Sequence, residues 1–362
     1  MRYKAVVFAI LVLFFLAGQG SGWCRTNDMK QLCANCHTMH NSAGGLEVTP
    51  GGIGVQNYLL NSTCYGCHSG TNTAGSMPYV TNVAGEPNYG TTGTSAAGVV
   101  NGTLAGGSFY WVSQGDNGKG HNVEGLEIVA QGPRTPPGGS KVFDNTSPST
   151  ALTCAGTNGC HGNLAVAGQI PAMYRTHHAN PALPVDGASV ASSYRFLNGI
   201  VGLEDLDYEF TVSSAADNHN QYRGSARSAD NDLDTSSISH LCAVCHGFFH
   251  NGGGNNGVGD PGFVSPWIRH PVDYDMNDAV GAEYQDYGGA GNQYLVETPV
   301  ASDDLTGGAK STVLKSPGDA IITCITCHRA HGSRFDSSLR WDYKSWPASG
   351  YNGCGDCHTF KD

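Results

Sequence analysis

The sequence predicts a fold of mostly irregular coil, with short α-helices and little β structure. Glycine occupies 51 of 362 positions and charged residues make up 14%. Only a modest apolar core is therefore possible, yet the charge is too low for a disordered polymer. More than half of the residues from 69 to 120 are Gly, Asn, Ser or Thr, without helical or strand periodicity. The 13 cysteines and 15 histidines are the groups expected to organise the interior.

The N-terminus has the pattern of a signal peptide. Arg2 and Lys4 precede an apolar run from 5 to 16, and small residues follow up to Gly22. This is the order of a charged region, an apolar region and a cleavage zone. The run is also shorter than the roughly 20 residues that a bilayer span requires. We expect residues 1–22 to be removed, residues 23–362 to be exported as a single domain, and no membrane span to remain.

The charge of the chain argues against nucleic-acid binding. The formal net charge is −11, from 19 basic and 30 acidic residues, and no long basic run is present. Binding to a phosphate backbone requires clustered Lys and Arg side chains, which this sequence lacks.

Six segments share one pattern, in which a histidine directly follows the second of two cysteines. In five of them two residues separate the cysteines, which fits one short helical turn. These five are Cys33, Cys36 and His37; Cys64, Cys67 and His68; Cys242, Cys245 and His246; Cys324, Cys327 and His328; and Cys354, Cys357 and His358. Outside the motifs, residues 190–206 are the best candidate for a helix.

Covalent haem explains this pattern better than disulfides or zinc. A disulfide framework, common in exported proteins, gives no reason for the histidines. Zinc sites would need further ligands at regular offsets. In haem c, two thiols bind the two vinyl groups and the next histidine binds the iron. The sequence therefore predicts a multihaem c-type cytochrome with six covalent haem c groups, organised around a stacked haem chain.

The third motif departs from the common spacing. Five residues separate Cys154 from Cys160, and His161 follows. Both sulfurs can reach one porphyrin only if the extra residues bulge outward, which Gly156 and Gly159 make sterically easy. The alternative is a local disulfide with an incidental histidine. Cys24, after the cleavage zone, is left over and is assigned no chemistry.

The second ligand of each iron bears on function. An iron bound by histidine on both sides passes electrons without binding substrate, whereas an open position favours catalysis or gas binding. Residues outside the motifs supply nine histidines for six irons: His40, His121, His177, His178, His219, His240, His250, His270 and His331. His40, His250 and His331 closely follow a motif histidine, so each is expected to reach a neighbouring haem. His121 and His270 lie in loops that can project a ligand.

Several segments resemble the OmcS-type extracellular multihaem cytochromes, the nanowire subunits of metal-reducing bacteria. These segments are 33–42, 119–122, 269–271, 327–331 and 335–337, together with a last haem motif almost at the C-terminus. Their order covers nearly the whole mature chain, although the spacers between them differ.

The resemblance implies a hexahaem subunit with bis-histidine ligation that polymerises into a filament. It implies that His40 binds, across the subunit interface, the iron held by His328 of the adjacent subunit. His121, His250, His270 and His331 would serve within the subunit. The family has a histidine soon after its third motif, and this sequence offers none before His177 and His178. We expect one of these two, preferably His178, to complete the third site. His219 is a reserve candidate, and His240 is expected to be structural or exposed.

The leading functional prediction is an extracellular electron conduit. It would be a cell-surface homopolymer that takes electrons from outer-membrane or periplasmic donors and delivers them to metal oxides or other external acceptors. The alternative is a monomeric periplasmic or secreted electron shuttle. An enzyme with an open iron is disfavoured, because all six motifs end in histidine and further histidines exceed the need.

Overall fold

The structure is a computed structural model of the chain. The residues that it describes are 36–37, 42–43, 46–47, 59–60, 62–73, 77–88, 102–126, 132–179, 184–210, 218–226, 234–251, 270, 272–279, 284–345 and 351–358. The expected signal peptide, Cys33, His40 and the side chain of His250 lie outside them. Within the described part of the chain, no helix has the length and apolar character needed to cross a membrane.

The described helices are short, and four of them coincide with the Cys-His motifs. Among them α5 alone is long, with 14 residues, and its backbone departs from helical geometry at His246. The α-helices are α2 (Cys64–Cys67), α3 (Tyr110–Ser113), α4 (Gln169–Ala172), α5 (Ile238–Asn251), α6 (Cys324–Cys327) and α7 (Cys354–Cys357). The described 3₁₀ turns are η3 (Asn117–Lys119), η4 (Thr176–His178), η5 (Tyr194–Phe196), η7 (Met276–Ala279), η8 (Gly289–Gly291), η9 (Asp336–Ser338) and η10 (Tyr343–Ser345).

The described strands are two residues long and form isolated pairs. Three pairs are antiparallel: β1 (Ser42–Ala43) with β2 (Leu46–Glu47), β5 (Gly202–Leu203) with β6 (Gln221–Tyr222), and β7 (Tyr274–Asp275) with β8 (Ile321–Ile322). The fourth, β3 (Ser69–Gly70) with β4 (Thr81–Asn82), is parallel. The predicted fold of mostly coil with short helices and little β structure is confirmed.

The helix expected over residues 190–206 is wrong. This segment contains only the turn η5 and the strand β5. Arg195 and Phe196 have φ angles of 47° and 60°, in the left-handed region that a right-handed helix cannot continue through. The backbone N–H of Arg195 donates to Glu204 over 2.5 Å, and its guanidinium donates to Asn220 over 3.0 Å. Tertiary contacts therefore override the helical spacing of apolar residues.

In the described part of the chain, the buried apolar residues form three small clusters. The first includes the buried Tyr287 and Tyr294, the second Tyr194 and Tyr222, and the third Phe109. Each cluster packs beside at least one motif cysteine or motif helix, since Cys357 joins the first, Ile325 of α6 the second and Cys154 the third. The apolar core therefore supports the motifs in separate pieces.

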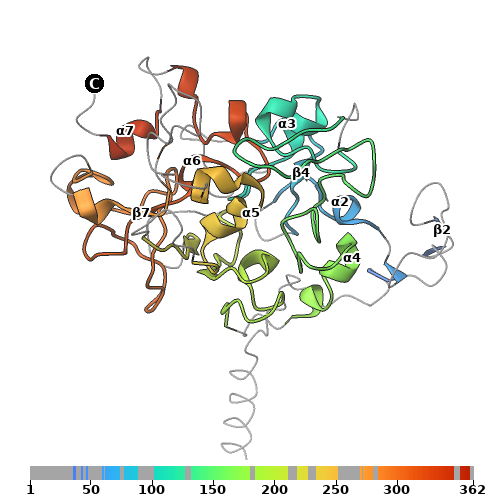
Figure 1. The fold of residues 1–362 in the computed structure, drawn as a ribbon, viewed down its shortest axis with the longest axis horizontal. Helices are drawn as coiled ribbons and strands as arrows, with labels where there is room; N and C mark the ends of the chain where they lie inside the picture. Colours follow the sequence, from blue (N-terminus) through green and yellow to red (C-terminus); the bar gives the residue numbers. More distant parts are fainter. Residues whose placement is uncertain are drawn as a thin grey trace, which may run out of the picture.

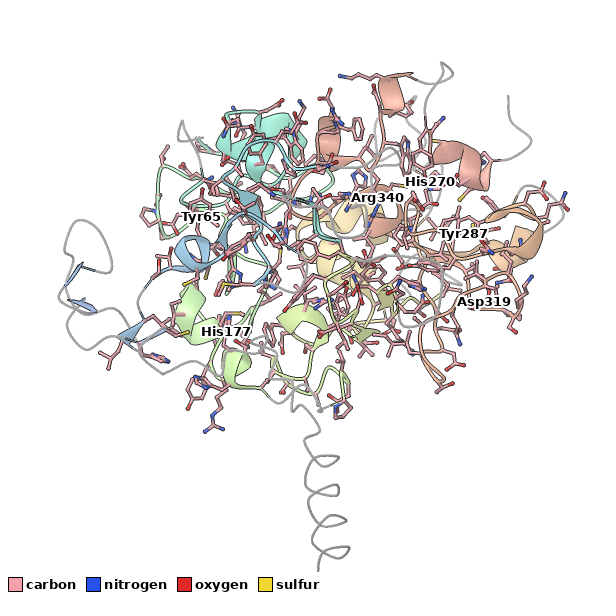
Figure 2. All side chains as sticks on the ribbon, turned by 180° about the vertical axis from the view of Figure 1, so that it is seen from behind. Tyr65, His177, His270, Tyr287, Asp319 and Arg340 are labelled. Atoms are coloured by element: carbon pink, nitrogen blue, oxygen red, sulfur yellow. The ribbon has the colours of Figure 1, made fainter. Side chains whose placement is uncertain are left out.

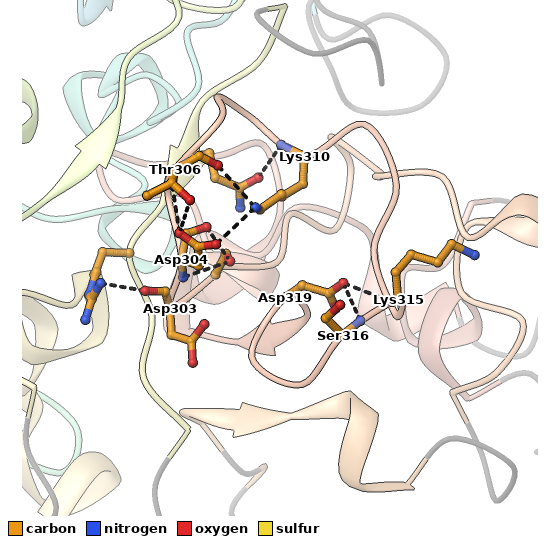
Figure 3. Close-up of polar contacts among 10 residues, drawn as sticks. Asp303, Asp304, Thr306, Lys310, Lys315, Ser316 and Asp319 are labelled. Atoms are coloured by element: carbon orange, nitrogen blue, oxygen red, sulfur yellow. Dashed lines mark hydrogen bonds and ion pairs between the residues drawn. The ribbon is translucent and has the colours of Figure 1, made fainter.

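Carboxylates organise some of the irregular segments. Asp319 accepts hydrogen bonds from the backbone N–H groups of Leu314, Lys315 and Ser316, at 2.9, 2.9 and 3.0 Å (Figure 3). Asp304 accepts two further hydrogen bonds from Thr306. These turns satisfy backbone donors that a strand or helix would otherwise satisfy.

The motifs cross the molecule in chain order. Figure 1 shows α2 on one side of the ribbon, α7 on the opposite side, and α5 and α6 between them. Contacts between α5 and α6 bring the fourth and fifth motifs together.

Candidate haem centres

Three regular motifs, those of α2, α6 and α7, form one helical turn that ends at the histidine, whereas the fourth motif lies within the longer α5. In these three, the backbone N–H of the histidine donates to the carbonyl of the first cysteine: His68 to Cys64 over 2.9 Å, His328 to Cys324 over 3.1 Å, and His358 to Cys354 over 2.8 Å. Thr63 caps α2 by accepting from the N–H of Gly66 at 3.1 Å. The turn fixes the two cysteines and the histidine relative to one another.

The third motif keeps this hydrogen bond despite its longer spacing. The N–H of His161 donates to the carbonyl of Cys154 over 2.9 Å. The intervening residues form a separate loop, in which Gly159 donates to Gly156 over 2.8 Å and Thr157 donates to Val166 over 3.2 Å. The extra residues thus form a loop of their own that packs against residues 166–172, and the ends of the motif resemble those of the regular ones.

Gly156 makes this bulge possible, which gives a first prediction. Its φ is +85°, and a Cβ atom there would lie 2.8 Å from the carbonyl oxygen of Val166. We expect Gly156→Val to cost about 1–2 kcal/mol in backbone strain, and to reduce haem attachment at Cys154 and Cys160 as measured by peptide mass spectrometry. Gly132→Val is the control, because a Cβ atom at Gly132 would have no described neighbour within 4 Å. Equal haem loading in both variants would contradict this role for Gly156.

Five motif histidines each face a second imidazole. The distances between ring centres are 6.2 Å for His37 and His178, 6.3 Å for His68 and His177, 6.3 Å for His161 and His331, 6.1 Å for His246 and His121, and 6.0 Å for His358 and His270. Direct ring stacking brings centres much closer, as for His219 and Tyr294 at 3.9 Å. The five pairs therefore leave a gap between their rings.

The width of this gap fits a metal ion. An ion bound at about 2 Å by the nearer nitrogen of each of two opposed imidazoles holds their ring centres about 6 Å apart. The five distances span only 6.0 to 6.3 Å. Together with the adjoining cysteine pairs, this donor set fits a covalently attached haem with histidine on both faces.

Hydrogen bonds orient the imidazoles for this role. A carbonyl can only accept, so each Nδ1 must donate and the neutral ring keeps the lone pair of Nε2 for a metal. The acceptors are the carbonyls of Pro78 for His68 at 2.8 Å, Ala330 for His121 at 2.6 Å, Arg195 for His161 at 3.0 Å, Pro137 for His246 at 2.7 Å and Ser337 for His328 at 2.8 Å.

Burial keeps several of these rings neutral. It lowers the pKa of His331 to about 3 and that of His177 to about 4, with nearby histidines adding to the effect on His177. Burial also lowers the pKa values of His121 and His161. An imidazole with such a pKa is unprotonated near neutral pH and can act as a ligand.

The pairing differs from the expected one at the third motif. We expected His178 beside His161, but His331 lies there and His178 faces His37. Because His177 and His178 follow each other in η4, they point to two different motifs. The two adjacent histidines were a signal in the sequence that both could be used. His219 is buried against Tyr294, and His240 lies partly buried in α5.

His328 is the exception among the motif histidines. The Nδ1 of His328 donates to the carbonyl of Ser337, but no imidazole of the described residues faces its ring. The histidine expected to complete its site, His40, lies outside the described residues.

Cysteines of consecutive motifs lie close together through the molecule. The thiol of Cys64 interacts with that of Cys154, and the thiol of Cys242 interacts with that of Cys324. Electrostatic contacts join Cys36 with Cys67, Cys160 with Cys245, and Cys327 with Cys354. Every motif therefore adjoins the next one along the chain. Cys154 contacts Cys64 of the second motif. Both Cys154 and Cys160 are free thiols, so the structure does not contain the local disulfide that was the alternative at the third motif.

Comparison with known proteins adds three findings. Residues 318–362 match the family model of a doubled CXXCH motif, and no curated protein matches the chain. The outer membrane cytochrome S filament from Geobacter sulfurreducens is 22% identical, with 86% of this chain and 84% of that chain covered and a TM-score of 0.44. A second structure, of the OmcS nanowires from Geobacter sulfurreducens, is 22% identical, with 85% and 83% covered and a TM-score of 0.43.

Proposed function

We propose that this chain is a hexahaem c-type cytochrome subunit that carries electrons along a row of bis-histidine haems. The observation that carries the proposal is the set of five imidazole pairs with ring centres 6.0 to 6.3 Å apart, one pair for each of five Cys-His motifs. Haem, when bound, supplies an iron that takes up and releases one electron.

The residues of the chain attach, orient and enclose these groups. The attachment residues are Cys33, Cys36, Cys64, Cys67, Cys154, Cys160, Cys242, Cys245, Cys324, Cys327, Cys354 and Cys357. In the proposed ligation, the pairs are His37 with His178, His68 with His177, His161 with His331, His246 with His121, and His358 with His270. Contacts between cysteines of successive motifs support a continuous row, since each haem would adjoin the next.

We further propose that the subunits polymerise outside the cell. In this arrangement His40 of one subunit binds the iron at His328 of the next, which supplies the ligand that no described residue provides. The filament would take electrons from outer-membrane or periplasmic donors and pass them to metal oxides or other external acceptors. A monomeric secreted or periplasmic shuttle remains the second candidate, and it would leave the iron at His328 differently coordinated.

The same pairs favour an electron carrier over an enzyme. A catalytic iron needs an open face, and the five paired imidazoles leave none at their own sites. We therefore expect the reduced native protein to bind little carbon monoxide, as measured by absorption spectroscopy. Strong binding would instead support a reductase with an open iron.

The deciding experiment combines imaging with spectroscopy of the purified extracellular protein. We expect filaments in negative stain, wholly low-spin haem in absorption and EPR spectra, and six haems per chain by intact mass. Discrete particles with a high-spin fraction of about one sixth would favour the monomeric shuttle. Fewer than six haems would reject the hexahaem assignment and identify the site that is not loaded.

A further inference from the structure

Arg340 is a buried cation beside the fifth motif. Its side chain is 4% exposed, and its backbone N–H donates to the carbonyl of Cys327 over 2.9 Å. Its Nε donates to the carbonyl of Ile325 over 2.7 Å, within α6, and one terminal nitrogen lies 3.5 Å from the carbonyl of Val296. Figure 2 labels Arg340 near the middle of the view. The guanidinium is thus fixed against the helix that carries Cys324 and Cys327.

No anion neutralises this charge in the described part of the chain. The hydrogen-bond acceptors of the guanidinium are neutral carbonyls, and no carboxylate of the described residues lies within 4 Å of it. By contrast, Arg195 pairs with Glu204 and Arg223 pairs with Asp234. A buried charge without a counter-ion is costly, and its field is weakly screened by solvent. The positive charge of Arg340 therefore raises the electrostatic potential at the groups around it.

Two contacts hold Arg340 beside the residues of the fifth motif. Its backbone N–H donates to the carbonyl of Cys327 and its Nε donates to the carbonyl of Ile325. Because His328 directly follows Cys327, the fixed positive charge lies next to the residues that would attach and bind the haem.

We propose that Arg340 raises the reduction potential of the haem held by Cys324, Cys327 and His328. The inference rests on the proposed function, because it requires a haem at this motif. A ferrous haem carries one positive charge less than a ferric haem, so a fixed positive charge stabilises the reduced form. At an effective dielectric constant of about 20, a unit charge about 10 Å from a redox centre changes its one-electron equilibrium roughly tenfold. This corresponds to about 59 mV.

Such a shift gives the fifth haem a particular place in electron transfer. It is the haem for which we propose a ligand from the adjacent subunit. A raised potential makes an electron reside there for longer than at an otherwise equal neighbour. Arg340 would therefore control how electrons cross from one subunit to the next.

The test is a spectroelectrochemical titration of the full secreted protein. Arg340→Met removes the charge but keeps a long side chain, and replacing a buried ion by an apolar residue is often tolerated. We expect one of the six haems to become roughly tenfold harder to reduce, a shift of about 59 mV to lower potential. Arg340→Lys keeps the charge and should shift the reduction potential of that haem less. Arg334→Gln is the surface control, since Arg334 is half-exposed and 3.7 Å from Glu86.

The outcomes separate this inference from the proposed function. If Arg340→Met retains six haems by mass and titrates like the wild type, the inference is wrong and the proposed function stands. If the wild type carries no haem at Cys324 and Cys327, the proposed function fails first. Arg340→Gln provides a second neutral variant. If neither neutral variant is secreted while Arg340→Lys is, Arg340 has a folding role and the inference is overturned.

Discussion

Replacing His331 with alanine is expected to open the haem attached at Cys154 and Cys160 and no other. His331 is the imidazole that faces His161, at 6.3 Å between ring centres, and its ring is half-buried. One haem in six should therefore become high-spin in the oxidised protein and bind carbon monoxide when reduced. Absorption and EPR spectra of the purified variant measure both effects, with intact mass as the check that six haems remain attached.

Two further variants make this result specific. His219→Ala removes a histidine that is 1% exposed and stacked on Tyr294. It should lower the free energy of unfolding by about 1–3 kcal/mol without producing a high-spin haem. His178→Ala should open the haem at His37 instead, which peptide-resolved labelling of the open iron or site-resolved NMR can assign. A wholly low-spin His331→Ala protein would exclude the proposed pairing.

The local parts of these sites are predictable from the sequence. A Cys-x-x-Cys-His segment closes one helical turn through a hydrogen bond between residues four apart, as His68 and Cys64 do at 2.9 Å. This geometry depends only on residues within the turn. The glycines of the third motif likewise predict a bulge, because Gly156 adopts a φ of +85° that other residues avoid.

The second histidine of each imidazole pair is not predictable in the same way. His331 closely follows His328 in the sequence but faces His161. His121 donates to the carbonyl of Ala330, which precedes His331, and its ring faces His246. These pairings depend on long-range contacts such as the bridges of Gly332 to Gly107 and Gly120. The spacing of histidines along the chain indicates that His331 reaches another motif, but it does not specify which one. The burial of Arg340, with no carboxylate of the described residues beside its guanidinium, is equally a tertiary effect.

Replacing His40 with alanine is expected to abolish filaments while leaving six haems attached. Attachment depends on the cysteines, whereas assembly in the proposed arrangement depends on the bond from His40 to the iron at His328 of the next subunit. The loss of this ligand should also leave one open iron per chain, which carbon monoxide binding measures. Negative-stain imaging and size-exclusion chromatography of the secreted variant then report assembly independently of the haem spectra.

The matched variant is His250→Ala, because His250 is the other histidine close to a motif that could complete the same iron. If His250→Ala opens the iron at His328 and leaves filaments intact, the fifth haem is completed within one subunit and assembly must depend on protein contacts. If His40→Ala opens it instead, coordination and assembly are one event. Each added subunit would then convert a five-coordinate terminal haem into a low-spin one, so the high-spin fraction should fall in inverse proportion to filament length. That relation distinguishes a ligand that joins subunits from one that merely lies near their interface.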